Sequence, residues 1–379
     1  MKIGIFTFFG TLNFGVNMQA LSVYQVLRTL YPNDEIEFIN VQRVSKERYR
    51  PALRNANFKS IILDLRRIRL YKVLKNSMYY SKMPMVTKDY MEATDYIIKQ
   101  NYDKIYVGAD TVLEFQPYNT NGNIPYFWLS DQIKAKKFFI SASARGLNVD
   151  DIDSISLNLL RNNIRDFNLL GVRDEATFDV IVKLVPEKKN FTSIIPDPTI
   201  LYDIDYAHAQ SYAKRKGLDR GNWVFIHVKT VEKWVLEFIE LAKSEGYKIA
   251  SLTYVKGIDK LVNDMGPLEH AGIFRYFKFV ITHRFHDSVF CFKNTIPVVA
   301  CFSHRLFSSN KGHSKYSNLF SYFGYEKIAL LDSDKPLTGE VVLKSVSDLN
   351  AVYCQEKVIL RLSELKDSLE SYIRSTLSQ

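Results

Sequence analysis

The sequence predicts an α/β protein in which two Rossmann-like domains face each other across a cleft. Short apolar segments alternate with helical patterns over residues 1–203, and after a polar stretch the alternation restarts at residue 223. Strands that alternate with helices in this way form parallel sheets with helices on both faces. A chain of 379 residues with 46% hydrophobic residues is long enough for two domains with ordinary cores.

The first predicted domain covers residues 1–203. Apolar residues recur at helical spacing over residues 17–30, so a helix is expected there. Short apolar runs predict the strands of this domain at residues 2–8, 36–41, 104–107, 137–141 and 169–172. A basic amphipathic segment, residues 43–82, interrupts the alternation.

The second predicted domain covers residues 223–379 and follows a polar linker at residues 204–222. Strands are expected at residues 223–228, 248–253, 279–282 and 296–301. Helices are expected at residues 231–244, 288–293, 316–323 and 352–377, the last one packing back on the first domain. Ligands of such folds bind outside the carboxyl ends of the strands, so the site is expected there.

The cysteine content favours a reducing compartment. Cys291, Cys301 and Cys354 form an odd and sparse set without a CxxC or Cys/His metal-binding spacing. The first residues read as a strand rather than as a signal peptide, and no run of about eighteen apolar residues occurs. We therefore expect a cytoplasmic protein without a membrane-spanning segment.

The excess positive charge is confined to residues 43–82. This segment holds twelve Lys or Arg residues against two acids, which accounts for the whole net charge of +10. Apolar residues recur at helical spacing from Phe58 to Ile68, so an amphipathic helix is predicted. An anionic membrane surface, a solvated helix face and packing on the second domain all fit this pattern. Nucleic acid is not expected as a partner, because no nucleic-acid-binding motif accompanies the bases.

The most informative motif follows the predicted strand at residues 279–282 and reads His283-Arg284-Phe285-His286-Asp287. Arg284 and His286 are two residues apart at a strand end, so both side chains can face one ligand. Arginine offers a planar fork for a carboxylate or phosphate, and histidine exchanges protons near neutral pH. The simpler interpretation is a surface arginine beside a histidine satisfied in the core. Metal binding is not predicted, since two histidines three apart without a clear third ligand are a weak signal.

Two strand ends of the first domain carry polar residues. The loop Asn13-Phe14-Gly15-Val16-Asn17 opens a helix, where backbone N–H groups can meet an anion or where Asn13 serves as an ordinary cap. The loop is neither a GxGxxG nor a Walker motif, so nucleotide binding is not predicted. Asp110 follows the strand at residues 104–107 and either binds substrate hydroxyls or caps a helix.

Two further strand ends carry Ser143 and Arg173. Ser143 lies among small residues, which let a ligand approach the backbone. Arg173 follows the strand at residues 169–172 and stands beside Asp174, so it binds either an anionic ligand or a neighbouring acid.

Taken in order, these motifs resemble those of the polysaccharide pyruvyl transferase family. The shared elements are Asn13-Phe14-Gly15, Gly108-Ala109-Asp110, Ala142-Ser143-Ala144-Arg145-Gly146, Val172-Arg173-Asp174, Asp197-Pro198-Thr199 and Arg284-Phe285-His286-Asp287. They extend over almost the whole chain. Two positions differ from the family pattern: Thr111-Val112-Leu113 stands in place of Gln-x-Trp, and Asp287 stands in place of a small residue.

The resemblance implies a GT-B-like architecture and transfer of a pyruvyl group from phosphoenolpyruvate to a sugar. Phosphate is released, and a cyclic ketal forms across two hydroxyls of a bacterial surface polysaccharide or its lipid-linked precursor. His286 is then the general acid/base, and Asp110 binds or activates the acceptor hydroxyls. The resemblance assigns donor binding to Arg173, Arg284, Lys315 and Ser143, and the acceptor loop to Asn13, Gly15, Asn17 and His283. No metal or other cofactor is required.

Two other functions fit the same cleft. A GT-B glycosyltransferase would use a nucleotide sugar, and a non-catalytic protein would bind a sugar or a lipid, because the fold by itself does not decide between them. A lipid-linked acceptor would place the protein at the inner face of a membrane, which the basic segment at residues 43–82 favours.

Overall fold

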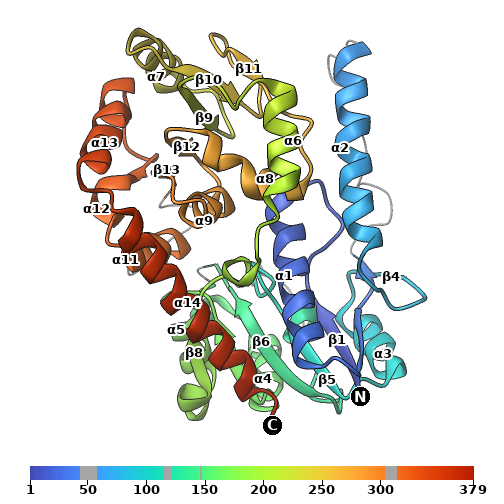
Figure 1. Cartoon of the computed structure of the whole chain (residues 1–379). Coiled ribbons are helices and arrows are strands. Elements are labelled where there is room, and N and C mark those ends of the chain that lie inside the picture. Colours follow the sequence, from blue (N-terminus) through green and yellow to red (C-terminus); the bar gives the residue numbers. More distant parts are fainter. Residues whose placement is uncertain (43–57, 115–121, 146, 304–313) are drawn as a thin grey trace.

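The computed structural model describes residues 1–42, 58–114, 122–145, 147–303 and 314–379. Its two large sheets are six-stranded, and all neighbouring strands in them are parallel. The strands of the first sheet lie between residues 2 and 194, and those of the second lie between residues 223 and 332. Figure 1 shows one domain above the other, with the last helix running across both. The predicted α/β class with two Rossmann-like domains is confirmed.

The first sheet has the strand order β2-β1-β5-β6-β7-β8. The chain adds β2 on one side of β1 and then crosses to the other side to form β5. The carboxyl ends of β1 and β5 therefore flank a switch point, where ligands of this fold bind. The strands are β1 (Lys2–Phe6), β2 (Glu35–Phe38), β5 (Lys104–Val107), β6 (Lys136–Ala142), β7 (Leu169–Val172) and β8 (Thr192–Ile194).

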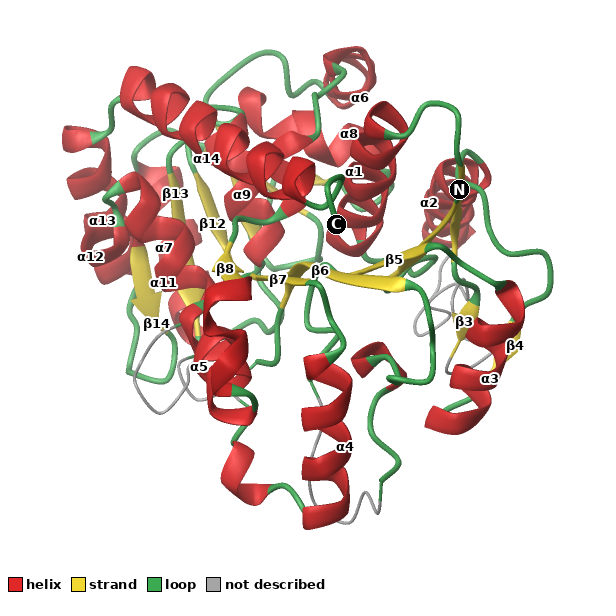
Figure 2. Cartoon of the chain, turned by 90° about the horizontal axis from the view of Figure 1, so that it is seen from below, coloured by secondary structure: helices red, strands yellow, loops and turns green. Residues whose placement is uncertain are grey.

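Both faces of the first sheet are covered by helices (Figure 2). Along β6, Phe138 and Ile140 join the core beneath α1 (Phe14–Leu30) and α14 (Gln355–Ser375). Phe139 points the other way, into a core shared with three helices on the opposite face. These three are α3 (Tyr90–Gln100), α4 (Ser154–Arg165) and α5 (Glu175–Leu184). The alternation explains why the strand is apolar at nearly every position.

The second sheet repeats this plan with the order β11-β10-β9-β12-β13-β14. Its switch point lies between β9 and β12. The strands are β9 (Trp223–His227), β10 (Lys248–Ser251), β11 (Lys260–Leu261), β12 (Val280–Thr282), β13 (Val298–Phe302) and β14 (Leu330–Asp332). The helices are α7 (Lys233–Ser244), α8 (Pro267–Ile273), α9 (Phe285–Lys293), α11 (Lys315–Phe323), α12 (Glu326–Ala329) and α13 (Gly339–Val352).

The sequence predicts a polar linker at residues 204–222, but this segment contains helix α6 (Tyr206–Lys216). Ala209 and Tyr212 are buried, and α6 packs against α8. The helix ends at Gly217, which adopts the left-handed conformation that glycine favours. Few of its side chains are buried, so the apolar pattern is weak in the sequence.

Helix α14 ties the end of the chain to the first domain. The Tyr372 hydroxyl donates to the Phe139 carbonyl oxygen at 2.7 Å, and the Lys104 ammonium donates to the Thr376 carbonyl oxygen at 2.8 Å. Leu369 and Ile373 are also buried in the core next to the first sheet. Helix α14 therefore begins in the second domain and packs with its last turns against the first sheet.

The basic segment contributes helix α2 (Phe58–Asn76), while residues 43–57 lie outside the described residues. Tyr71 and Leu74 are buried, and the Arg66 guanidinium lies 3.4 Å from the Asp264 carboxylate of the second domain. Two short strands, β3 (Val41–Gln42) and β4 (Met85–Val86), pair in parallel with each other and form a separate two-stranded sheet. Within the described residues, no helix has the length and apolar character needed to cross a bilayer.

Candidate active site

A cavity of about 410 Å³ lies between the two domains. Its walls come from the loops that follow β1, β5, β10 and β12, from the end of β9, and from helices α1, α2, α8, α9 and α11. The lining residues are Leu12, Asn13, Phe14, Arg67, Tyr71, Asp110, His227, Leu252, Thr253, Met265, His270, His283, Arg284, Phe285, His286, Lys315 and Tyr316. The cavity therefore meets the carboxyl ends of strands in both sheets, where the switch points predict a ligand.

The loop after β1 is held in shape by two asparagines. The Asn13 side chain accepts hydrogen bonds from the Gly15 and Val16 N–H groups and so caps α1. The Asn17 amide donates to the carbonyl oxygens of Thr11 and Asn13 at 2.7 and 2.6 Å. Asn17 is fully buried and does not line the cavity, so the structure gives it the role of fixing the loop.

Gly15 is the point where this loop meets the second domain. A Cβ atom at this position would lie 2.2 Å from Nδ1 of His286, so only glycine leaves room for the imidazole. His286 lies in the first turn of α9, and its Nε2 is 3.5 Å from the Asp197 carboxylate. The imidazole therefore lies between the two domains and on the wall of the cavity.

Arg173 is the centre of a buried charge network. Its guanidinium donates to Asp110 at 3.1 Å and to Asp197 at 3.3 Å, and only 2% of the side chain is exposed. Asp197 also accepts a hydrogen bond from the Gln19 amide at 2.5 Å. Arg173 does not line the cavity but lies behind Asp110, which does. The guanidinium that the family resemblance assigns to the donor is already bound to two carboxylates.

The network keeps both carboxylates ionised. Burial raises the pKa of Asp110, but the positive charges of Lys315 and Arg173 outweigh this effect and lower the pKa to about 2. Burial likewise raises the pKa of Asp197, and the neighbouring His286 and Arg173 lower it below its ordinary value. The carboxylates of Asp110 and Asp197 and the Arg173 guanidinium thus form a fixed group with a net negative charge next to the cavity.

Two cationic side chains of the second domain line the cavity. Burial and the nearby Arg173 lower the pKa of Lys315 to about 8, and its ammonium lies 3.9 Å from Asp110 and over the Phe285 ring. Arg284 is exposed, and its guanidinium makes no hydrogen bond or ion pair with the described residues. Its backbone N–H donates to the Thr282 hydroxyl, which orients the turn. The Arg284 fork can therefore receive an anionic ligand.

Of the two predicted site residues Ser143 and His283, only His283 lines the cavity. The Ser143 hydroxyl donates to Asp174 at 2.7 Å behind the cavity wall, so the structure does not place it in the cavity. The His283 ring does line the cavity. Burial, together with the charges of His227 and Arg284, lowers the pKa of His283 to about 4, so its imidazole is neutral at pH 7.

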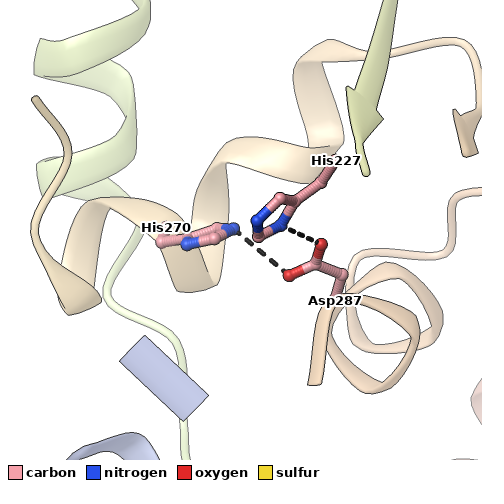
Figure 3. A group of neighbouring side chains, drawn as sticks. All are labelled: His227, His270 and Asp287. Atoms are coloured by element: carbon pink, nitrogen blue, oxygen red, sulfur yellow. Dashed lines mark hydrogen bonds and ion pairs between the residues drawn. The ribbon is translucent and has the colours of Figure 1, made fainter. Parts of the chain in front are cut away.

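A second group of titratable side chains lies on the same cavity. Nδ1 of His227 is 2.6 Å from one oxygen of Asp287, and Nε2 of His270 is 3.5 Å from the other. Figure 3 shows the three side chains pointing toward one another from the end of β9, from α8 and from α9. Their ligand-type atoms lie within 4.8 Å of one another, so among the described residues these three form a group that could hold a metal ion.

Sequence reasoning missed His227 and His270. His227 ends β9 next to the end of β12, since it pairs with Thr282 in the sheet. A histidine at a strand end was the available signal, but nothing in the sequence places it beside residue 287. His270 lies on α8, a helix that the sequence pattern did not predict.

The chain has a two-domain α/β fold of the GT-B type. The UDP-GlcNAc 2-epimerase of Methanocaldococcus jannaschii superposes with a TM-score of 0.59 at 11% identity, covering 100% of both chains. Anabaena Alr3699/HepE in complex with UDP-glucose superposes with a TM-score of 0.53 at 11% identity, covering 100% of this chain and 99% of that one. At such low identity these similarities show the fold and leave the reaction open.

The family follows from the sequence itself. The family model described as polysaccharide pyruvyl transferase matches residues 13–305, which is most of the chain. The protein therefore belongs to the polysaccharide pyruvyl transferase family. Comparison with curated protein sequences gave no match.

Proposed function

We propose that this protein transfers the pyruvyl group of phosphoenolpyruvate to two hydroxyls of a saccharide and releases phosphate. One observation carries the proposal. In a chain of the polysaccharide pyruvyl transferase family, Arg284, Lys315 and His286 line one cavity of about 410 Å³. A cavity of this size lies within the range of small-molecule sites, about 300–1,000 Å³.

The cations of the cavity suit the donor. Phosphoenolpyruvate carries a carboxylate and a phosphate, and Arg284 offers two parallel N–H groups to either one. Lys315 adds a point charge when it is protonated. Arg173 is held behind Asp110, which supports a positioning role: it fixes Asp110 at the cavity and Asp197 beside His286.

The reaction needs proton transfers, and His286 is placed to make them. A proton is added to the methylene carbon of phosphoenolpyruvate, and the adjacent carbon becomes electrophilic and is attacked by the first hydroxyl. The second hydroxyl then displaces phosphate at the same carbon and closes the ketal, and its proton leaves with the phosphate. His286 donates the first proton and accepts one from a hydroxyl, and such a group typically contributes about 10²–10⁴-fold.

Asp110 supports acceptor binding in this scheme. It lines the cavity, and a pKa of about 2 makes it a weak base. We therefore assign it to accepting a hydrogen bond from an acceptor hydroxyl and not to removing its proton.

Turnover distinguishes this function from its alternatives. The purified protein is incubated with phosphoenolpyruvate and a panel of saccharides, and separately with sugar nucleotides and the same panel. Acceptor-dependent phosphate release, with a ketal detected by mass spectrometry, is the expected result. Release of a nucleoside diphosphate would indicate a glycosyltransferase, and no release in either reaction would indicate a binding protein; both results contradict the proposal.

The outward side of α2 supports contact with an anionic membrane, where a lipid-linked acceptor would lie. Ile62, Leu65 and Val73 are 50%, 54% and 61% exposed, and Arg69 and Lys72 are exposed with them. These positions recur at helical spacing and share one face. A base near such a surface contributes about 1 kcal/mol.

Liposome co-sedimentation tests the membrane contact. We expect binding to anionic liposomes that fades as salt is added, because salt screens the charges. Replacing Arg69 and Lys72 with Gln should weaken it, whereas replacing Lys233 and Lys344, exposed bases of the other domain, should not. Equal recovery in the supernatant with anionic and neutral liposomes would exclude this role and favour an acceptor that is not lipid-linked.

A further inference from the structure

The cluster of His227, His270 and Asp287 lies on the cavity wall but takes no part in the proposed reaction. We propose that it binds one divalent first-row transition-metal ion, for which Zn²⁺ is a suitable probe. This inference is independent of the donor and of the acceptor, because it concerns three side chains of the second domain only.

The composition of the cluster is that of a metal site. Two imidazoles and one carboxylate on three different elements are a common ligand set for zinc and for non-haem iron. Residues 227, 270 and 287 are far apart in sequence, and the fold brings their ligand atoms within 4.8 Å of one another. The first turn of α9, which carries Asp287, also favours a negatively charged side chain.

Two buried atoms of the cluster without a hydrogen-bond partner are suited to binding a cation. Nε2 of His270 and Oδ1 of Asp287 are buried, lie 3.5 Å apart and make no hydrogen bond with any described residue. In a tetrahedral zinc site with bonds of about 2.0–2.1 Å, neighbouring ligand atoms lie about 3.3 Å apart. The separation in the structure is close to that value. The 2.6 Å contact between His227 and Asp287 has to lengthen when the ion binds.

The surroundings of the carboxylate are compatible with a metal. Asp287 is fully buried, and only 3% of His270 is exposed. The Thr282 hydroxyl donates to Oδ2 of Asp287 at 2.7 Å and orients the carboxylate, as outer-shell groups do in metal sites.

The site is open to the cavity on one side. His227 and His270 both line the cavity, whereas Asp287 lies behind them. Three protein ligands with access to a cavity leave a position for water or a ligand, which distinguishes such a site from a closed structural one.

Metal binding is tested on the full chain after removal of metal by a chelator. Because the exposed Cys354 thiol can bind zinc, the protein carries Cys354→Ser. Equilibrium dialysis against Zn²⁺ should give about one ion per chain, and Co²⁺ should give the visible absorption of a site with nitrogen and oxygen ligands. His270→Gln and Asp287→Asn should abolish both signals, and Thr282→Val should weaken binding about 10–100-fold.

His208→Gln is the matched control, since His208 forms an exposed pair with Asp205 and should contribute nothing to binding. Two results would overturn the proposal. One is that the Cys354→Ser protein binds no more than a substoichiometric trace of metal. The other is binding that His270→Gln and Asp287→Asn both leave unchanged. Either would mean that His227 and Asp287 form a hydrogen-bonded pair beside His270 without a metal.

Discussion

Arg173 and Arg284 each follow a parallel strand, β7 in the first domain and β12 in the second, but their surroundings are opposite. Arg173 is buried, with 2% of its side chain exposed, and donates to Asp110 and Asp197. Arg284 is exposed on the cavity and makes no ion pair with the described residues. The same residue type thus organises the site in the first domain and faces the ligand in the second.

The difference follows from the cost of burying charge. A buried guanidinium is tolerated only when carboxylates and hydrogen bonds compensate for its lost hydration. Once it is paired in this way, it is a rigid part of the site and is not available to a ligand. An exposed guanidinium keeps its hydration until a ligand replaces the water. Its N–H groups are therefore available to bind the ligand.

The largest effect is expected from removing Arg173. Arg173→Met leaves Asp110 and Asp197 buried without their cation, which should lower the free energy of unfolding by about 3–5 kcal/mol. Chemical denaturation measures it. Arg165→Met is the control, since Arg165 pairs with Glu187 on the surface and should change the stability far less. A stable Arg173→Met variant that has lost only its affinity for phosphoenolpyruvate would make Arg173 a ligand-binding residue like Arg284.

The next effect concerns the imidazole between the two domains. His286→Ala should lower kcat about 10²–10⁴-fold with little change in KM, because it removes a proton donor and acceptor. Steady-state kinetics on the folded variant measures this, with His208→Ala as a control far from the cavity. A near-normal kcat in folded His286→Ala would remove His286 from the mechanism.

A smaller effect is expected at Arg284. Arg284→Lys keeps the charge but loses the two-pronged geometry, so KM for phosphoenolpyruvate should rise about tenfold, equivalent to about 1.4 kcal/mol. The value of kcat should change little. Arg361→Lys on α14 controls for a general effect of the substitution. If KM stays constant and kcat falls, Arg284 stabilises the transition state and does not hold the donor.

The smallest effect is a pH dependence set by Lys315. In the free protein its pKa is about 8, so the ammonium loses its proton as the pH rises through this value. Affinity for phosphoenolpyruvate should be constant from pH 7 to about 8 and then weaken several-fold, by less than about tenfold in all, up to about pH 9.5. Calorimetric titration measures it. Lys315→Met should remove the dependence.

Lys293→Met is the matched control for this pH dependence. Burial also lowers the pKa of Lys293, to about 7, but its ammonium donates to the carbonyl oxygens of Ile200 and Tyr202 and does not line the cavity. It should keep the pH dependence of the wild type. A flat affinity up to about pH 9.5 in the wild type would exclude Lys315 as a donor contact.

The fold could be predicted because its signal is local. Buried parallel strands such as β5 and β7 are short apolar runs, and their positions were predicted from the sequence alone. Helix α6 was not predicted, because few of its side chains are buried and the segment reads as polar.

The site was predictable only in part. Strand ends indicated Asp110, Arg173, Arg284 and His286, but the sequence does not show that Arg173 pairs with Asp110 and Asp197, which are distant in the chain. The cluster of His227 and Asp287 joins residues sixty positions apart, and only the packing of β9 against β12 and α9 reveals it. Whether a charged residue is available to a ligand depends on such long-range contacts.

Binding of the donor tests the central claim most directly. Phosphoenolpyruvate and a series of UDP-sugars are titrated separately into the wild-type protein and into Arg284→Met, with heat as the signal. We predict that phosphoenolpyruvate binds the wild type at one site, that Arg284→Met weakens this binding and that the UDP-sugars do not bind. Binding of a UDP-sugar, with no binding of phosphoenolpyruvate up to millimolar concentration, would contradict the account.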